Sequence, residues 1–178
     1  RVLFRSVYIK GEAQMKYTLS VLVENQPGVL SKVSGLFSRR GFNIDSLAVG
    51  VTEDPAISRI TIVVDGDEHI VEQVEKQLNK LIAVIKVKNL TTSGSYVSCL
   101  LMLVKVTCST KQRLEVMKIA EQMKADVVDV ANNSLTLQYA STLENIETLT
   151  SLLRPYGIKE LVRTGTVALE RGSSTAHK

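Results

Sequence analysis

The chain contains 178 residues, 44% of them hydrophobic and 22% charged, a composition that fits one globular domain or two small ones and excludes a disordered chain. Its formal net charge of +4 lies in residues 1–14 and 171–178, so a nucleic-acid-binding surface of Lys and Arg on the folded body is not expected. The apolar run at 99–104 is far shorter than the roughly 20 residues that a membrane-spanning helix requires.

The first half of the chain, residues 15–90, predicts a unit in which strands and helices alternate. The expected strands are rich in β-branched and aliphatic side chains: 17–23, 42–51, 60–64 and 83–90. A first helix is expected from Val29 to Gly41, because apolar residues recur at helical spacing and the glycine follows two arginines. A second helix is expected after Asp67, a good N-cap residue. The predicted order is βαββαβ.

The second half, residues 96–171, repeats this order after a Thr, Ser and Gly stretch at 91–95 that predicts a flexible connection. The expected strands are 97–107, 126–131, 134–140 and 158–170, and the expected helices are 111–124 and 141–154. Asn132 and Asn133 suit a two-residue turn with positive φ, and Ser141 and Glu144 suit a capping box.

Two α+β domains of ferredoxin-like topology are therefore expected in tandem, one at 15–90 and one at 96–171. Each should place two helices on one face of a mostly antiparallel sheet. Residues 1–14 and 172–178 are expected to be tails.

Few side chains suit catalysis or metal binding. Cys99 and Cys108, with His69 and His177, predict neither a structural zinc site nor a disulfide framework, and two packed thiols in a reducing compartment are expected. No Walker loop, Rossmann glycine pattern or HExxH motif occurs. Ferredoxin-like acylphosphatases use an arginine in the loop after the first strand, but the loop at 24–28 has none. RNA-binding members stack bases on aromatics of two central strands, but the segments 18–23 and 60–64 contain none. No catalytic residue, metal site or resident cofactor is predicted.

A small group of residues near the first helix suits a free α-amino acid. Gly28 opens the helix, where unpaired N–H groups favour a carboxylate and a glycine lets a ligand approach the backbone. The amides of Asn25 and Asn43 can donate to a carboxylate and accept from an ammonium group. Ordinary turn chemistry explains the same residues, so both interpretations stay open at this point.

One long string gives a more specific indication. The sequence from Leu22, LVENQPGVLSKVSGLFSRRGFNIDSLAVG, resembles the ACT domain of the regulatory (small) subunit of acetohydroxyacid synthase, also called acetolactate synthase. The resemblance continues through SRITIVV, VEQVEKQLNKLIAVIKV, LMLVKV and RPYGIKELVRTGTVALERG, and so covers nearly all of residues 15–172. It departs at 96–100, where the family usually has a charged Glu-Arg-Glu run.

The resemblance implies that the first domain is an ACT domain in a non-catalytic subunit. Such a subunit activates a catalytic partner and confers feedback inhibition by valine chiefly, or by leucine or isoleucine. The effector is then expected at the interface of a homodimer formed through ACT domains, at positions matching Asn25, Gly28, Val29, Asn43 and Ile44. Thiamine diphosphate, FAD and Mg²⁺ would belong to the catalytic partner. The alternatives are an amino-acid-sensing module that regulates another enzyme and, third, an acylphosphatase-like enzyme.

Residues 1–14 are weakly basic and poor in acidic residues, as a transit-peptide remnant is, although Met15 is equally suited as a native start. The sequences of the motifs resemble those of the plant and algal form of this subunit. This predicts the plastid stroma, with the bacterial cytoplasm as the alternative. Because plant versions carry two such units in tandem, the chain can be one unit of a longer protein.

Overall fold

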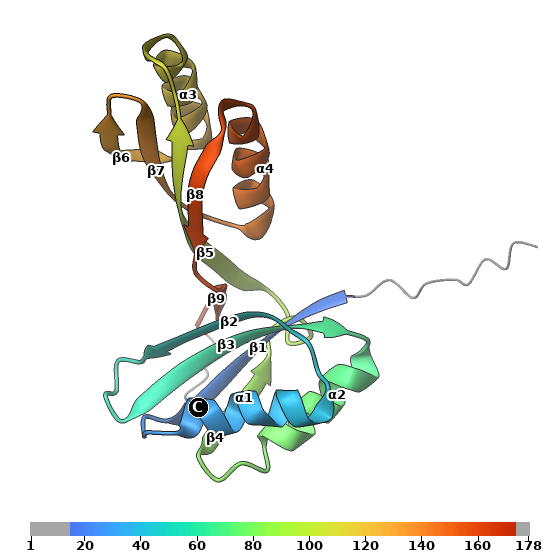
Figure 1. Ribbon diagram of the computed structural model, residues 1–178. Coiled ribbons are helices and arrows are strands. Elements are labelled where there is room, and N and C mark those ends of the chain that lie inside the picture. The colour runs from blue at the N-terminus through green and yellow to red at the C-terminus, as the bar shows by residue number, and fades with distance from the viewer. Residues whose placement is uncertain (1–14, 174–178) are drawn as a thin grey trace, which may run out of the picture.

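The computed structural model describes residues 15–173, so the expected tail at 1–14 and residues 174–178 of the other lie outside the described residues. The described chain forms two units, each an antiparallel sheet with two helices on one face, and the first sheet has four strands whereas the second has five (Figure 1). This confirms the prediction of two ferredoxin-like α+β units in tandem. No helix of the described residues is long and apolar enough to cross a membrane.

The first unit has its strands in the order β2-β3-β1-β4. Its elements are β1 (Met15–Glu24), α1 (Val29–Arg40), β2 (Ile44–Val51), β3 (Ile57–Gly66), α2 (Glu68–Leu78) and β4 (Val84–Asn89). The predicted helix ends are confirmed. Gly41 closes α1 in the left-handed conformation with φ 66°, and the Asp67 carboxylate accepts a 2.7 Å hydrogen bond from the N–H of Ile70.

The second unit has the same topology, with its strands in the order β6-β7-β5-β8. Its elements are β5 (Tyr96–Thr107), α3 (Thr110–Met123), β6 (Asp126–Ala131), β7 (Ser134–Ser141), α4 (Leu143–Leu153), a short 3-10 helix (Arg154–Tyr156), β8 (Ile158–Arg163) and β9 (Val167–Glu170). A capping box between Ser109 and Gln112 begins α3.

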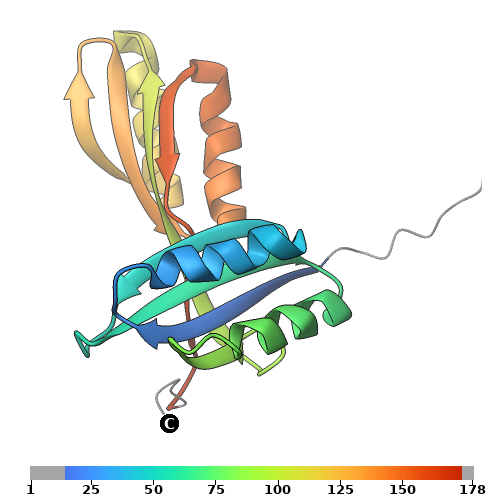
Figure 2. The same cartoon turned by 60° about the horizontal axis from the view of Figure 1, so that its bottom comes forward.

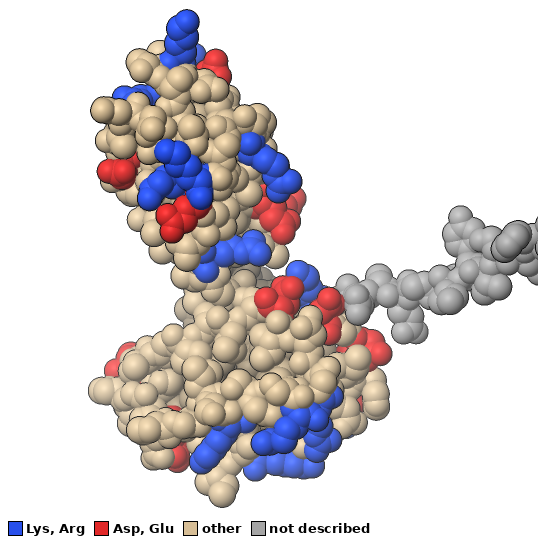
Figure 3. Space-filling view, in the orientation of Figure 1, with Lys and Arg blue, Asp and Glu red and all other residues tan. Residues whose placement is uncertain are grey.

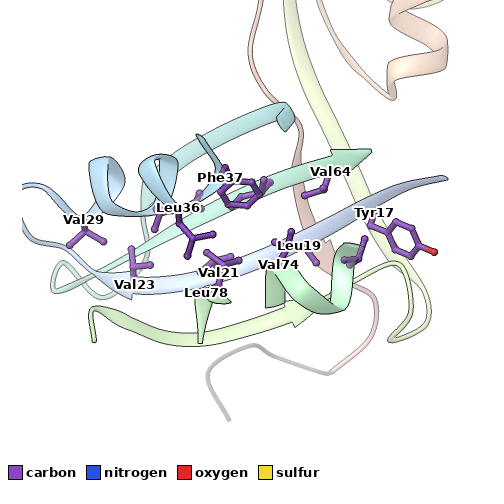
Figure 4. Close-up of a cluster of buried hydrophobic side chains, with 14 residues drawn as sticks. Tyr17, Leu19, Val21, Val23, Val29, Leu36, Phe37, Val64, Val74 and Leu78 are labelled. Carbon is purple, nitrogen blue, oxygen red and sulfur yellow. The ribbon is translucent and has the colours of Figure 1, made fainter. Parts of the chain in front are cut away.

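Each sheet packs its helices over a separate hydrophobic core. In the first core, the predicted α1 stripe of Val29, Val33, Leu36 and Phe37 is buried, as Figure 4 shows for three of these residues. In the second core, α3 and α4 contribute these buried residues: Val116, Ala120, Ile146, Leu149 and Leu153. The helical spacing of apolar residues therefore indicated the buried face of α1 correctly.

Three local predictions for the second half are wrong. Neither Asn132 nor Asn133 has a positive φ, and the turn carbonyls are held from outside the hairpin. The Arg113 guanidinium donates to the carbonyls of Ala131 and Asn132 at 2.7 and 2.9 Å, and the N–H of Cys108 donates to the Asn133 carbonyl.

The second correction concerns the start of α4. Thr142, not Ser141, is the N-cap, and its side chain accepts from the N–H of Asn145. Ser141 is instead the last residue of β7, and its hydroxyl accepts from the Asn145 amide. Sequence alone could not choose between adjacent hydroxyl residues, because either satisfies the same helix N–H group.

The third correction concerns the expected strand 158–170, which is interrupted at 164–166. Both resulting strands pair with β5, β8 at its C-terminal part and β9 at its N-terminal part. The pairs Met102–Arg163 and Cys99–Val167 differ by one residue in register, as at a β-bulge.

The short ribbon of β9 and the start of β5 covers the face of the first sheet that the helices leave open (Figure 2). Thr18, Ser20 and Thr61 point to this face and are buried. The Tyr96 hydroxyl lies 3.5 Å from the Thr18 hydroxyl, and the Lys88 ammonium lies 2.5 Å from the Glu170 carboxylate. The segment at 96–100, where the sequence departs from the family pattern, thus packs against the first unit.

The burial of two leucines on α4 predicts that replacing each by alanine changes the free energy of unfolding by different amounts. Leu149 is fully buried, so Leu149→Ala should lower the free energy of unfolding by about 2–5 kcal/mol. Leu152 is 45% exposed, so Leu152→Ala should change it by less than about 0.5 kcal/mol. Urea denaturation followed by circular dichroism measures both values, and equal effects would contradict the assignment of the α4 core face.

Candidate functional site

The predicted effector residues fall into two groups at opposite ends of α1. Asn25, Gly28 and Val29 lie in the loop before the helix and in its first turn, whereas Asn43 and Ile44 follow its last turn. The helix has 12 residues, and a rise of about 1.5 Å per residue makes it about 18 Å long. A free amino acid is much shorter than this, so one chain does not bring the two groups together.

The loop before α1 has the geometry expected of an anion-binding helix start. Gly28 is the N-cap residue with φ 82°, a left-handed conformation that favours glycine, and no side chain caps this end. The first turn carries no acidic residue. The exposed N–H groups and the positive end of the helix dipole therefore face solvent without a competing carboxylate.

Asn25 is held in place by the turn between β2 and β3. Its side-chain amide donates to the Pro55 carbonyl at 2.9 Å, and its backbone N–H donates to the Ala56 carbonyl at 2.8 Å. Because a carbonyl only accepts, the nitrogen of the Asn25 amide faces Pro55. One amide hydrogen is therefore engaged within the fold, and Asn25 also helps to fix the shape of the loop.

Val29 and Ile44 contribute mainly to the first core. Val29 is 5% exposed, and Ile44 is partly buried against the same cluster. The Val29 side chain therefore serves mainly the core, while its backbone lies at the helix start. Asn43 is exposed.

Two surface hollows lie on the first unit, and the smaller one adjoins the α1 start. One of about 240 Å³ lies beside the α1 start and is lined by Val29, Lys32, Lys80, Leu81, Ile82, Ala83 and Val84. A larger groove of about 640 Å³ separates the end of β2 from the β5–β9 ribbon, and Val49, Val51, Val97 and Val167 are among its apolar lining residues. Neither contains Asn25, Gly28 or Asn43.

No further strand of residues 15–173 pairs with the edge of the first sheet next to α1, although the 164–166 segment lies against Ser46 and Leu47 of that strand. β2 is an edge strand, paired only with β3, and α1 lies on the β2 side of the sheet while α2 lies on the β4 side (Figure 2). Small residues recur at helical spacing along α1 and are partly or fully exposed: Ser31, Ser34, Gly35 and Ser38. A second backbone can therefore approach this helix closely.

Charged residues do not assemble into a reactive cluster in the described chain. Lys and Arg gather over the helix-covered side of the first unit (Figure 3), where α1 ends in Arg39 and Arg40. Arg40 donates to Gln77 at 3.0 Å, so this part of the charge supports helix packing. No three His, Cys, Asp or Glu residues in 15–173 lie close enough to hold a metal ion.

The Tyr156 hydroxyl, in the second unit, is a titratable group with a shifted pKa. Desolvation, together with a hydrogen bond to Glu115, raises the pKa of the Tyr156 hydroxyl. Tyr156 belongs to the 3-10 helix of the second unit, whereas the predicted effector residues all lie in the first. The perturbed pKa therefore gives no support for acid–base chemistry at the α1 ends.

Comparisons with known proteins give consistent matches over both units. Residues 19–86 match the model described as the AHAS small subunit-like ACT domain, and residues 100–172 match the model described as the small subunit of acetolactate synthase. The probable acetolactate synthase small subunit of Archaeoglobus fulgidus is 49% identical over 159 residues, covering 89% of this chain and 99% of that protein.

Two further matches extend this result. The acetolactate synthase small subunit of Mycolicibacterium smegmatis is 49% identical over 156 residues, covering 88% of this chain and 91% of that protein. The crystal structure of the acetolactate synthase small subunit from Thermotoga maritima superposes with a TM-score of 0.84 at 35% identity, covering 90% of this chain and 99% of that one.

The geometry of Gly28 predicts opposite effects for two alanine substitutions around α1. A Cβ at Gly28 meets no atom within 4 Å, but its φ of 82° should make Gly28→Ala cost roughly 1–2 kcal/mol. Gly35 lies inside the helix with its nearest neighbour at 3.8 Å, so Gly35→Ala should add about 0.5–1 kcal/mol. Denaturant unfolding measures both, and a stabilising Gly28→Ala would contradict the left-handed N-cap.

Proposed function

Because the chain belongs to the family of acetolactate synthase small subunits, we propose that it is a non-catalytic regulatory subunit of that synthase. It activates a catalytic subunit and makes it sensitive to a branched-chain amino acid, chiefly valine. The observation that carries the proposal is the match of both units to small-subunit models. A free-standing module regulating another enzyme would account for the first unit alone.

Thiamine diphosphate, FAD and Mg²⁺ are proposed to reside on the catalytic partner. The role of this chain is then to bind the effector and to alter the rate of the partner.

We place the effector between two copies of the chain. An antiparallel pairing of two β2 edges about a twofold axis would run α1 antiparallel to its copy. The start of one α1 would then lie beside the end of the other, which brings Gly28 of one chain near Asn43 of the partner subunit. The small residues Ser31, Ser34, Gly35 and Ser38 would permit this close approach. The 18 Å separation within one chain is thus removed by symmetry.

In this arrangement the α1 N–H groups, Asn43 and Asn25 would each have a separate role in binding the amino acid. The N–H groups at the α1 start would hold the α-carboxylate, and the Asn43 amide of the partner subunit would accept from the ammonium group. Asn25 would shape the loop that presents these N–H groups. The absence of a side-chain cap at Gly28 supports this assignment, because a ligand carboxylate can take the place that a capping oxygen usually fills.

The relatives above come from an archaeon and from bacteria. Of the two locations expected from the sequence, they favour the bacterial cytoplasm over the plastid, and we propose the cytoplasm as the site of action.

The proposed function predicts that Gly28→Asp abolishes valine inhibition while activation survives. A carboxylate placed beside that of valine costs on the order of several kcal/mol at an effective dielectric near 20, a loss of at least ~100-fold in affinity. Asn43→Ala should weaken valine by about 1–3 kcal/mol, since a charged group loses one hydrogen-bond partner.

Synthase activity of the reconstituted complex against valine concentration measures these effects, with calorimetric titration of the small subunit alongside. Lys118→Ala, at an exposed position on α3, is the control and should behave as wild type. Unchanged inhibition in both site variants would move the effector elsewhere and return Asn25, Gly28 and Asn43 to turn and cap roles.

Assembly gives a second test. Sedimentation at micromolar concentration with valine present should show a dimer of the 19.6 kDa chain. Ser34→Arg should reduce it to a monomer, because it places two arginines against each other between the α1 helices. Ser151→Arg, on the exposed side of α4, is the matched control. A wild-type chain that stays monomeric would contradict the proposal, because the site would lack the residues that the second copy supplies.

A further inference from the structure

The interruption between β8 and β9 lies directly against β2. At Gly165 a Cβ atom would lie 2.3 Å from the carbonyl oxygen and 2.5 Å from the carbonyl carbon of Leu47, closer than real Cβ contacts. The next residue adds a hydrogen bond, in which the N–H of Thr166 donates to the Ser46 hydroxyl at 2.8 Å. Two backbones thus meet here with no side chain between them.

The β2 side of this contact adjoins the proposed effector site without being part of it. Ile44 is the first residue of β2, Asn43 precedes it, and Ser46 and Leu47 follow within three residues. The pairing of β2 with β3 shifts register between Ile44 and Ser46, so this end of the strand is irregular. Asp45, at the shift, is paired with Lys16 at 3.0 Å. A change at Asn43 therefore reaches Leu47 through a short segment of strand.

The other side of the contact is tied to the second sheet. The N–H of Thr164 donates to the Leu101 carbonyl at 2.9 Å, and the Thr164 hydroxyl accepts from the N–H of Leu101 at 3.0 Å. β5 is a central strand of that sheet, paired with β7 on one side and β8 on the other. A displacement of Gly165 is therefore carried into the second unit by backbone hydrogen bonds.

We propose that Ser46, Gly165 and Thr166 form a coupling contact that passes the state of the effector site in the first unit to the second unit. Close-packed backbone leaves little room for a displacement to be absorbed locally, so β2 and the 164–166 segment must move together. The proposal rests on the proposed function, since it takes valine as the effector, and it makes these three residues positioning residues that touch neither effector nor substrate.

The test is Gly165→Ala in the full chain, combined with the catalytic subunit. The added methyl group must displace the Leu47 carbonyl and open the contact. We expect the isolated variant to bind valine with near wild-type affinity by calorimetry and the complex to remain activated. The ratio of the rates without and with saturating valine should fall by about 5-fold or more, the size of a typical allosteric coupling.

Matched variants separate coupling from general damage. Gly50→Ala lies on the same strand, where a Cβ would meet no atom within 4 Å, and should keep full inhibition. Ser46→Ala removes the acceptor for Thr166 and should reduce inhibition, whereas Ser46→Thr keeps a hydroxyl and should restore it. If Gly165→Ala fails to fold by circular dichroism, the Ser46 pair decides the matter.

Full inhibition in Gly165→Ala or in Ser46→Ala overturns the proposal, and so does loss of valine binding by the isolated Gly165→Ala chain, which would make the contact part of the binding site. The proposed function itself fails if the wild-type chain neither binds valine nor confers inhibition. Failure of the coupling contact is seen only in the variants.

Discussion

The backbone hydrogen bonding of β5 is the constraint on which the rest of the structure depends. This strand of 12 residues pairs with β9 at its start and with β7 and β8 along the remainder. Its first residues lie on the first sheet, and its later ones form the centre of the second. A flexible linker would let two such units move independently. β5 instead contacts the first sheet through Tyr96 at its start and pairs with β7, β8 and β9 in the second unit, so the two units are tied together by one strand.

The same constraint explains the buried polar residues on the back of the first sheet. Thr18, Ser20 and Thr61 have no helix above them and would be solvated in an isolated unit. Docking of the β5–β9 ribbon desolvates them, and the partnership of Tyr96 with Thr18 and of Lys88 with Glu170 compensates part of that cost. The ion pair is only 26% and 11% exposed on its two sides, so it is screened less than a surface pair.

The geometry of α1 decides what a single chain can do. Its start offers uncapped N–H groups, and its end is followed by Asn43, but the helix itself separates the two. A ligand that needs both must bind where two helices run in opposite directions. Effector binding and pairing of chains are therefore one equilibrium in the proposed function, and the occupied site stabilises the dimer by mass action.

The sequence by itself determined the elements, the topology and the buried face of α1, because these depend on local spacing and on residues such as Gly41 and Asp67 that act on their own helix. It also indicated the group around Gly28, since a helix start with glycine and no acidic side chain is a local property. The turn at Asn132, the N-cap at Thr142 and the interruption at Gly165 were decided only by the tertiary structure. In each case a partner distant in the sequence or an equivalent neighbour determines the outcome: Arg113 holds the turn, Thr142 competes with Ser141, and the Leu47 carbonyl leaves no space for a side chain at residue 165. The separation of Gly28 from Asn43 likewise follows from the straight helix between them, a distance that a pattern of residue types does not contain.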